Sequence, residues 1–237
     1  MEALDTLDTV DIELRSKLCV ALDVDDMVEA VRIARELSPW FGVAKVGLEL
    51  FTAAGTDAIG ILIGLGYDVF LDLKMYDIPT TVEKASRVLG ALGVKYATYH
   101  AQGGIDVLSA GAQGLREGAA DAGLEEPIPL AITVLTSDGS APEHIMPARV
   151  GTAVEASMGG LVCGPNDVRE AKQYAPRLFV ATPGIRPDGS DNHDQKNVST
   201  PKSALDNGSD LLVIGRAVTL ADDRVAAAES IVDSCLS

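Results

Sequence analysis

The chain has 237 residues, and its 19 lysines and arginines against 35 aspartates and glutamates give a net charge of −16 at pH 7. This acidity argues against a nucleic-acid partner, because polyphosphate backbones are bound mainly through clustered basic residues, and it also disfavours an anionic membrane surface. With 47% hydrophobic and 23% charged residues the composition is that of a globular protein, and no apolar stretch approaches the roughly 20 residues that a membrane span needs.

The N-terminal stretch carries several acidic residues before its first basic residue, Arg15, which is the reverse of the basic start of a signal peptide. We therefore expect a cytoplasmic protein. Residues 1–16 are expected to form an extension outside the main domain, either a surface helix or a disordered segment. The cysteines Cys19, Cys163 and Cys235 are odd in number and show no C-x-x-C spacing, so we expect reduced thiols and no zinc site.

Short runs rich in Val, Ile and Leu recur between segments with helical periodicity, and such continuous hydrophobicity is typical of strands buried on both faces. The first helical segment runs from Met27 to Leu37, and Pro39 ends it. The predicted strands are residues 18–22, 43–48, 69–73, 96–100, 128–135, 161–163, 178–182 and 211–214. Eight strand–helix units predict an α/β protein with a single (β/α)8 TIM barrel over residues 17–237, in preference to an open doubly wound sheet.

In such barrels the active site is built from the loops that follow the strands. The first strand leads to Asp23, the second contains Lys45, and the third ends with Asp72 and Lys74, followed by Asp77. Asp72 and Lys74 are two residues apart and therefore share one side of an extended chain. A purely structural salt-bridge cluster would give the same pattern. We favour a functional site, because burying these charges is costly unless their pairing is good.

Hydroxyl and polar groups follow the fifth and seventh predicted strands. Thr136 and Ser137 end the fifth strand, where they could bond a ligand. A long polar loop containing Gln195 precedes an apparent helix start at Thr200. Loops of this length in compact domains are commonly lids over an active site, with a plain surface loop as the alternative.

Two arginines follow the seventh and eighth strands, which in these barrels usually form a phosphate site. Arg186 lies in the segment after the seventh strand, and Gly215 and Arg216 follow the eighth. We expect the arginines to bind a phosphate together, with the backbone approaching it at the glycine. His100 ends the fourth strand, and we interpret it as a structural histidine in preference to a general base.

Three segments together resemble one known family. They are D-L-K-M-Y-D-I-P-T-T from residue 72, T-P-G-I-R-P from residue 182 and V-I-G-R from residue 213. These segments closely resemble the orotidine 5′-monophosphate decarboxylase family, and the similarity covers about residues 18–218. The resemblance implies a barrel without metal or cofactor. It also implies a homodimer, formed through the strand-end loops, that converts orotidine 5′-monophosphate to uridine 5′-monophosphate and CO2 in the last step of de novo UMP biosynthesis.

The resemblance implies a role for each charged residue. Lys74 would stabilise the negative charge that develops at C6 of the pyrimidine and then protonate that carbon. Asp72 would lie near the departing carboxylate. Asp77 would come from the other subunit and complete an alternating array of charges with Lys45.

The remaining implied positions bind substrate. Asp23 and Lys45 would bind the ribose hydroxyls, assisted across the interface by Thr81. Further positions are Thr136 and Ser137 at the pyrimidine, Gln195 in the lid, Arg186, Gly215 and Arg216 at the phosphate, and Pro183. The chain differs from common family residues at Tyr76, Thr80 and Asn197, none of which is assigned to the chemistry.

Two other functions fit part of the pattern. A magnesium-dependent sugar-phosphate decarboxylase or synthase of the same superfamily shares the D-x-K-x-x-D segment. Lys45 argues against it, because those relatives are expected to have an acidic metal ligand there and a lysine would repel the ion. A non-catalytic phosphate-binding barrel is the other alternative, and the presence of every charged position of the array argues against it.

Overall fold

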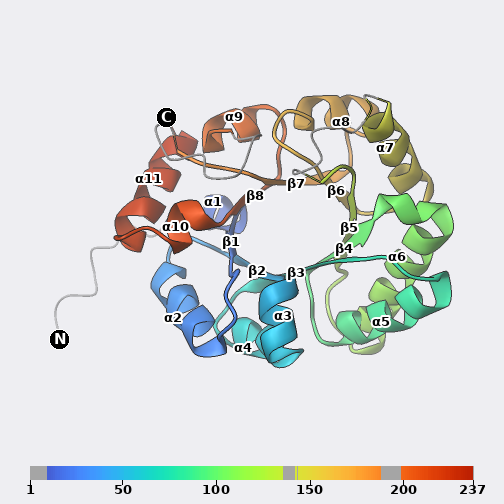
Figure 1. Cartoon of the computed structure of the whole chain (residues 1–237), viewed down its shortest axis with the longest axis horizontal. Coiled ribbons are helices and arrows are strands. Elements are labelled where there is room, and N and C mark those ends of the chain that lie inside the picture. Colours follow the sequence, from blue (N-terminus) through green and yellow to red (C-terminus); the bar gives the residue numbers. More distant parts are fainter. Residues whose placement is uncertain (1–9, 136–141, 143, 188–198, 237) are drawn as a thin grey trace.

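The computed structural model describes residues 10–135, 142, 144–187 and 199–236. Its centre is a closed barrel of eight parallel strands in chain order, with the last strand paired to the first (Figure 1). The strands are β1 (Leu18–Ala21), β2 (Val43–Gly47), β3 (Asp68–Met75), β4 (Tyr96–His100), β5 (Ile128–Ile132), β6 (Gly160–Val162), β7 (Phe179–Pro183) and β8 (Leu211–Ile214). The predicted (β/α)8 barrel is therefore confirmed.

Two predicted strand ends differ from the structure by more than one residue. β3 continues to Met75, two residues beyond the predicted range 69–73, and so includes Lys74. β5 ends at Ile132, although the apolar run continues to Leu135. The predicted strand was too long because Val134 and Leu135 are also apolar. These two residues line the cavity described below and are not part of the strand.

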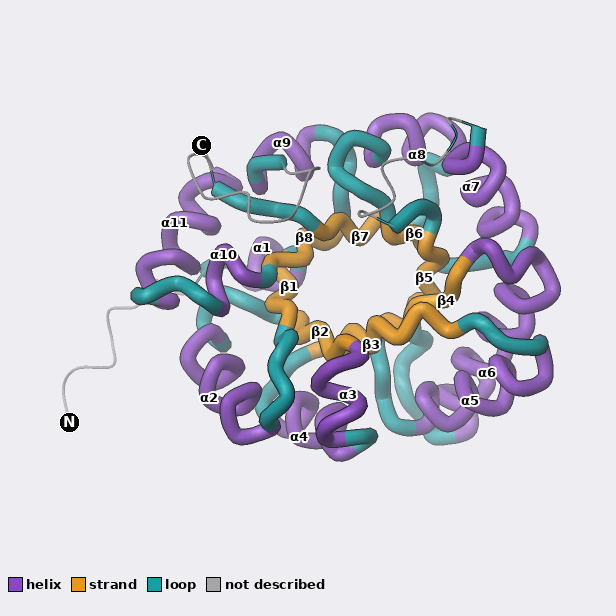
Figure 2. Tube along the Cα trace, in the orientation of Figure 1, coloured by secondary structure: helices purple, strands orange, loops and turns teal. Residues whose placement is uncertain are grey.

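Helices surround the strand ring on its outside, as Figure 2 shows. They are α1 (Ile12–Ser16), α2 (Met27–Leu37), α3 (Leu48–Ala54), α4 (Asp57–Gly64), α5 (Pro79–Ala91), α6 (Gly104–Asp121), α7 (Ile145–Glu155), α8 (Val168–Tyr174), α9 (Pro201–Asp206), α10 (Arg216–Thr219) and α11 (Arg224–Leu236), with a 3₁₀ turn η1 (Ala101–Gly103). In the part of the chain that the structure describes, no helix combines the length and hydropathy needed to cross a membrane.

Side-chain capping explains where two of these helices begin. The carboxylate of Asp26 accepts hydrogen bonds from the backbone N–H groups of Val28 and Glu29, at 3.0 and 3.3 Å, and so starts α2. The hydroxyl of Thr200 accepts from Ser203 N at 3.2 Å, and Pro201 occupies the first position of α9. The helix start predicted at Thr200 is confirmed.

The interior of the barrel is filled by alternate residues of the strands. A layer of apolar side chains packs there, separate from the larger core between strands and helices. This inner layer consists of Cys19, Ala21, Val43, Phe70, Tyr96, Leu130, Ala181, Leu211 and Val213. Since side chains alternate along a strand, the residues two positions further on face the same interior at the carboxyl ends of the strands. Those residues include Asp23, Lys45, Asp72 and Thr98, so the polar site begins where the apolar layer stops.

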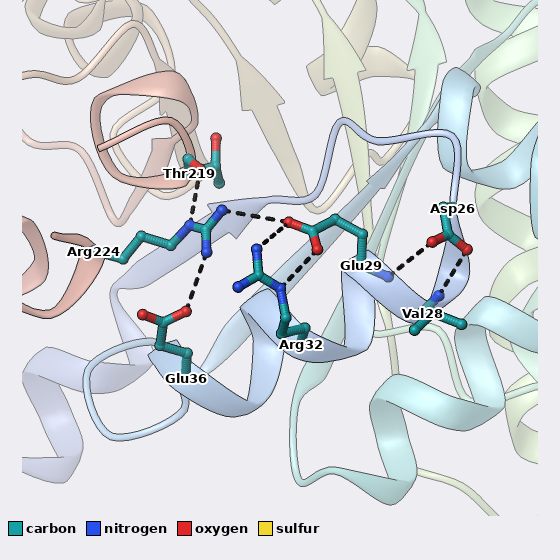
Figure 3. A network of polar contacts seen from close by, with 7 residues as sticks. All are labelled: Asp26, Val28, Glu29, Arg32, Glu36, Thr219 and Arg224. Carbon is teal, nitrogen blue, oxygen red and sulfur yellow. Dashed lines mark hydrogen bonds and ion pairs between the residues drawn. The ribbon is translucent and has the colours of Figure 1, made fainter. Parts of the chain in front are cut away.

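The chain ends are tied to the barrel at two places. The carbonyl of Arg15 in α1 accepts a hydrogen bond from Gly42 N at 2.8 Å, just before β2. Arg224 begins α11 and donates to the carbonyl of Thr219 at 2.9 Å and to the carboxylates of Glu36 and Glu29 of α2 at 3.2 and 3.4 Å (Figure 3). These bonds hold the last two helices against the first helix of the barrel, and α10 begins at the predicted phosphate residue Arg216.

Candidate active site

A cavity of about 620 Å³ opens at the carboxyl ends of the strands. It lies where the barrel fold predicts an active site. Eight of the predicted site residues line it: Asp23, Lys45, Asp72, Lys74, Pro183, Arg186, Gly215 and Arg216. The structure therefore brings together residues that are more than 190 positions apart in the chain.

One side of the cavity is a row of alternating charges. Asp23 Oδ1 lies 2.8 Å from Lys45 Nζ, Lys45 Nζ lies 3.8 Å from Asp72 Oδ2, and that same oxygen lies 2.8 Å from Lys74 Nζ. The order along the row is therefore acid, base, acid, base. Each buried carboxylate or ammonium group in it has an oppositely charged neighbour, which is the condition under which such burial is tolerated.

Lys45 is the most deeply buried member of the row, with 9% of its surface exposed. Burial by itself favours the neutral amine, but the charges of Asp23 and Asp72 outweigh it, and the net effect is a raised pKa for Lys45. The side chain is therefore a fixed positive charge at neutral pH. Its position follows from the strand pairing, because Leu22 N donates to the Lys45 carbonyl at 3.0 Å and so carries β1 far enough to place Asp23 beside Lys45.

Lys74 owes its position to an irregularity in β3. The pairing with β4 is regular at Leu71 and Ala97 but resumes only at Met75 and Tyr99, so β3 carries extra residues at this point. Lys74 has a φ of +52°, in the left-handed region that a side chain disfavours. Such a conformation costs of the order of 1 kcal/mol or more and persists only where surrounding contacts hold it.

Thr98 of β4 contacts both Lys74 and Asp72, and it was not predicted from the sequence. Its hydroxyl accepts a hydrogen bond from Lys74 N at 2.8 Å and donates one to Asp72 Oδ1 at 3.0 Å. Thr98 is fully buried. The available signal was its place in the sequence, two residues before His100, in the part of the strand that alternation directs toward the barrel interior.

Another part of the cavity wall is formed by the segments after β7 and β8, and β8 is paired to β1. Arg186 is buried, and its backbone N–H donates to Ser199 at 3.0 Å across a short bridge beside Gly184. Gly215 precedes α10, which begins with Arg216. Both arginines line the cavity, so two positive side chains face the same space as the charged row.

Five predicted site residues do not appear in the cavity lining. Asp77 and Thr81 are exposed on the surface beyond β3, where Asp77 Oδ1 accepts a hydrogen bond from Ile78 N at 2.6 Å. Thr136, Ser137 and Gln195 lie outside the described residues. The same holds for Asn197 and for most of the loop that was interpreted as a lid.

His100 is held by local contacts. Its Nδ1 accepts from Gln102 N at 3.2 Å, and its ring centroid lies 6.3 Å from that of Tyr76. Burial and the positive charges of Arg149 and Lys74 lower its pKa, which favours the neutral imidazole. A neutral ring whose Nδ1 is already an acceptor fits the structural role predicted for it.

The described residues of this site do not gather ligands for a metal ion. Among the described residues, His, Cys, Asp and Glu nowhere form a group of three or more arranged to hold an ion. The carboxylates of Asp23 and Asp72 are instead each bound by a lysine. All three cysteines are free thiols, and burial raises the pKa of Cys163 to about 12 and that of Cys235 to about 11.

The chain is similar, in sequence and in structure, to several proteins named orotidine 5′-phosphate decarboxylase. Orotidine 5′-phosphate decarboxylase of Moorella thermoacetica is 41% identical over 232 residues, which are 92% of this chain and 91% of that protein. The protein of the same name from Pseudoalteromonas translucida is 41% identical over 225 residues, covering 90% of this chain and 94% of the relative. The crystal structure of orotidine 5′-phosphate decarboxylase from Lactobacillus acidophilus superposes with a TM-score of 0.80 at 35% identity, covering 93% of this chain and 99% of that one.

A family-level comparison extends over nearly the whole barrel. The sequence profile described as "Orotidine 5'-phosphate decarboxylase / HUMPS family" matches residues 16–231, from the end of α1 into α11. The match includes the charged row and the two arginines that line the cavity. The chain therefore belongs to the orotidine 5′-phosphate decarboxylase / HUMPS family.

Proposed function

We propose that this protein is a carboxy-lyase that converts orotidine 5′-monophosphate to uridine 5′-monophosphate and CO2, the last step of de novo UMP biosynthesis. The observation that carries the proposal is the alternating row Asp23, Lys45, Asp72 and Lys74, which lines one cavity together with two arginines. Relatives named for this reaction cover the same part of the chain.

The charged row can serve the chemistry without a metal ion or cofactor. When the bond between C6 and the carboxylate breaks, CO2 leaves and the electron pair stays on C6. The Lys74 ammonium group stabilises this charge and then gives a proton to C6, so that a C–H bond replaces the C–C bond. Lys74 regains its proton from solvent. Asp72, 2.8 Å from Lys74 Nζ, keeps the ammonium group in place beside the departing carboxylate.

The other predicted residues then bind the rest of the substrate. Asp23 and Lys45 hold the ribose hydroxyls, and Pro183 forms part of the cavity wall. Arg186 and Arg216 bind the phosphate, with the Gly215 backbone beside it. Thr136 and Ser137 contact the pyrimidine, and Gln195 links base and phosphate from the lid. Binding energy from the phosphate, remote from C6, can in this way be used at the reacting carbon.

We further propose a homodimer in which Asp77 and Thr81 complete the site of the partner subunit. Both residues are exposed and lie just beyond the strand that carries Lys74. Tyr76 and Ile78, on either side of Asp77, are large hydrophobic side chains that are 59% and 66% exposed, a combination that favours burial against another surface. Mixing inactive Lys74→Ala and Asp77→Ala proteins should restore activity in hybrid dimers. Hybrids that stay inactive while each parent dimerises would contradict the shared site.

The magnesium-dependent alternative is disfavoured by the same geometry. Lys45 Nζ lies 2.8 Å and 3.8 Å from the two carboxylates that would otherwise be available to an ion. Its raised pKa keeps it positively charged, and a positive charge at that distance repels a divalent cation.

A cytoplasmic location stays a prediction from the sequence.

The decisive experiment is an ultraviolet assay of orotidine 5′-monophosphate with chelator-treated protein. Turnover is expected for the wild type and should be abolished in Lys74→Ala. Lys95→Ala is a matched control, because Lys95 pairs with Glu125 at 3.1 Å before β4, away from the cavity lining, and should keep full activity. Turnover of a sugar phosphate that requires added magnesium, with none of orotidine 5′-monophosphate, would overturn the proposal.

A further inference from the structure

The catalytic strand has an irregular backbone at the residue that the reaction needs most. Lys74 adopts the left-handed conformation at φ +52° inside the part of β3 where pairing with β4 is interrupted. Neither a glycine nor a proline imposes this shape, since Lys74 is flanked by Leu73 and Met75. Something outside the strand must therefore hold it.

Thr98 is the residue that meets the irregular segment. The Lys74 N–H donates to the Thr98 hydroxyl at 2.8 Å, so a side chain of β4 supplies the acceptor where strand pairing is interrupted. The single hydroxyl proton of Thr98 goes to Asp72 Oδ1 at 3.0 Å. One hydroxyl thus ties the backbone of Lys74 to the side chain of Asp72.

As a result, the two oxygen atoms of the Asp72 carboxylate have different partners. Oδ1 is occupied by Thr98, and Oδ2 faces Lys74 Nζ at 2.8 Å and Lys45 Nζ at 3.8 Å. Fixing Oδ1 prevents the carboxylate from rotating about its last bond, so Oδ2 stays directed at both lysines. The hydroxyl is fully buried, so water does not compete for these bonds.

From this geometry we propose that Thr98 is a positioning residue for the decarboxylation, acting through Asp72 and Lys74 without contacting the substrate. The inference rests on the proposed function for its kinetic consequences. Its structural part, the restraint of the Lys74 backbone, does not depend on the reaction.

The test is to remove the hydroxyl. Thr98→Val keeps the shape of the side chain and loses both hydrogen bonds. We expect kcat to fall about tenfold to 100-fold, because misplacing a reacting group by roughly 1 Å has an effect of that size. KM should stay within about twofold, since Thr98 touches neither the ribose nor the phosphate residues. Thr98→Ser keeps the hydroxyl and should restore most of kcat.

Thr182→Val is a matched control for the loss of a buried hydroxyl. Thr182 is also fully buried in a strand, but it lies on the side of β7 opposite to the interior residue Ala181, and its hydroxyl bonds to Ser209 at 2.8 Å. This variant should lose stability to a similar degree and keep kcat. If Thr98→Val and Thr182→Val lower kcat equally, or if Thr98→Ser fails to rescue, the positioning role is overturned.

A second measurement is independent of turnover. The exchange of the Lys74 amide hydrogen with solvent, followed by NMR, should be faster in Thr98→Val and unchanged in Thr98→Ser and Thr182→Val. Unchanged exchange in Thr98→Val would overturn the proposal even if kcat fell.

If the valine variant does not fold, Thr98→Ala removes the same hydroxyl without placing a methyl group against the carboxylate. A wild type that fails to decarboxylate would refute the proposed function, and amide exchange would still decide the role of Thr98.

Discussion

Gly47, at the end of β2, lies next to the Asp23–Lys45 ion pair, and replacing it with alanine tests whether that pair serves substrate binding. A Cβ atom at this position would lie 2.9 Å from Asp23 Oδ1 and 3.1 Å from Lys45 Nζ. Both distances are shorter than ordinary contact, so one group must move. Asp23 can do so because its side chain is 56% exposed, whereas that of Lys45 is only 11% exposed. We expect the carboxylate to turn toward solvent.

The magnitude follows from the hydrogen bond to the ribose that the proposed function assigns to Asp23. This bond is lost when the carboxylate turns away from Lys45, to which it is now joined at 2.8 Å. A hydrogen bond involving charged groups contributes about 1.5–3 kcal/mol, and the exposure of Asp23 reduces this toward about 1 kcal/mol. That free energy corresponds to a change of about fivefold to tenfold in an equilibrium constant. For Gly47→Ala we therefore expect KM for orotidine 5′-monophosphate to rise about fivefold to tenfold, with kcat within about twofold.

Steady-state kinetics and urea unfolding on the same preparations provide the assay. The control is Gly60→Ala in α4, where no atom lies within 4 Å of the added Cβ. An alanine inside a helix is favoured over glycine by about 1 kcal/mol, so this variant should gain stability and keep its KM. A Gly47→Ala protein that is as stable as the wild type and has an unchanged KM would refute the reasoning.

Three further predictions concern stability. Arg224→Met removes the bonds from α11 to Thr219 and to α2, and it should lower the free energy of unfolding in urea by about 1–3 kcal/mol; an unchanged midpoint would contradict this. Gly118→Ala would place a methyl group against the backbone carbonyl of Arg87, so α5 and α6 must separate, and the thermal midpoint should fall by an amount equivalent to about 1–3 kcal/mol or more; a midpoint equal to that of the wild type would show that the helices tolerate the contact. Burial raises the pKa of three tyrosines, so their contribution to stability is complete below about pH 10 and is lost as the pH rises through their folded-state pKa values. With the two other tyrosines changed to phenylalanine, tyrosinate absorbance should appear only as the protein unfolds, and its appearance in folded protein would disprove the assignment. The three buried residues are Tyr67, Tyr96 and Tyr99.

Much of the fold could be predicted from sequence, because the apolar runs and their spacing report burial directly. Continuous hydrophobic runs identified all eight strands, and the number of strand–helix units identified the barrel. The predicted ends of β3 and β5 were wrong for different reasons. β3 continues through the charged Lys74, which hydrophobicity does not mark as a strand residue. At β5, hydrophobicity does not distinguish a residue of the strand from an apolar residue that lines a cavity, as Val134 and Leu135 do.

The charged members of the site were also predictable from sequence. A barrel places every strand end on one face, so charges at the ends of β1, β2 and β3 must meet there. This argument correctly placed Asp23, Lys45, Asp72 and Lys74 together. It could not assign Asp77 and Thr81, because an exposed side chain gives no sign of what it contacts.

What the sequence determined by itself is therefore the set of elements and the chemical types at their ends. The tertiary structure decided which atoms pair. Thr98 looks like an ordinary strand residue in sequence, and Lys74 gives no sign of a left-handed backbone. Their 2.8 Å hydrogen bond depends on the register of β4 against an irregular β3. Register is set by the packing of all neighbouring strands at once, and that cooperative property cannot be read from either segment alone.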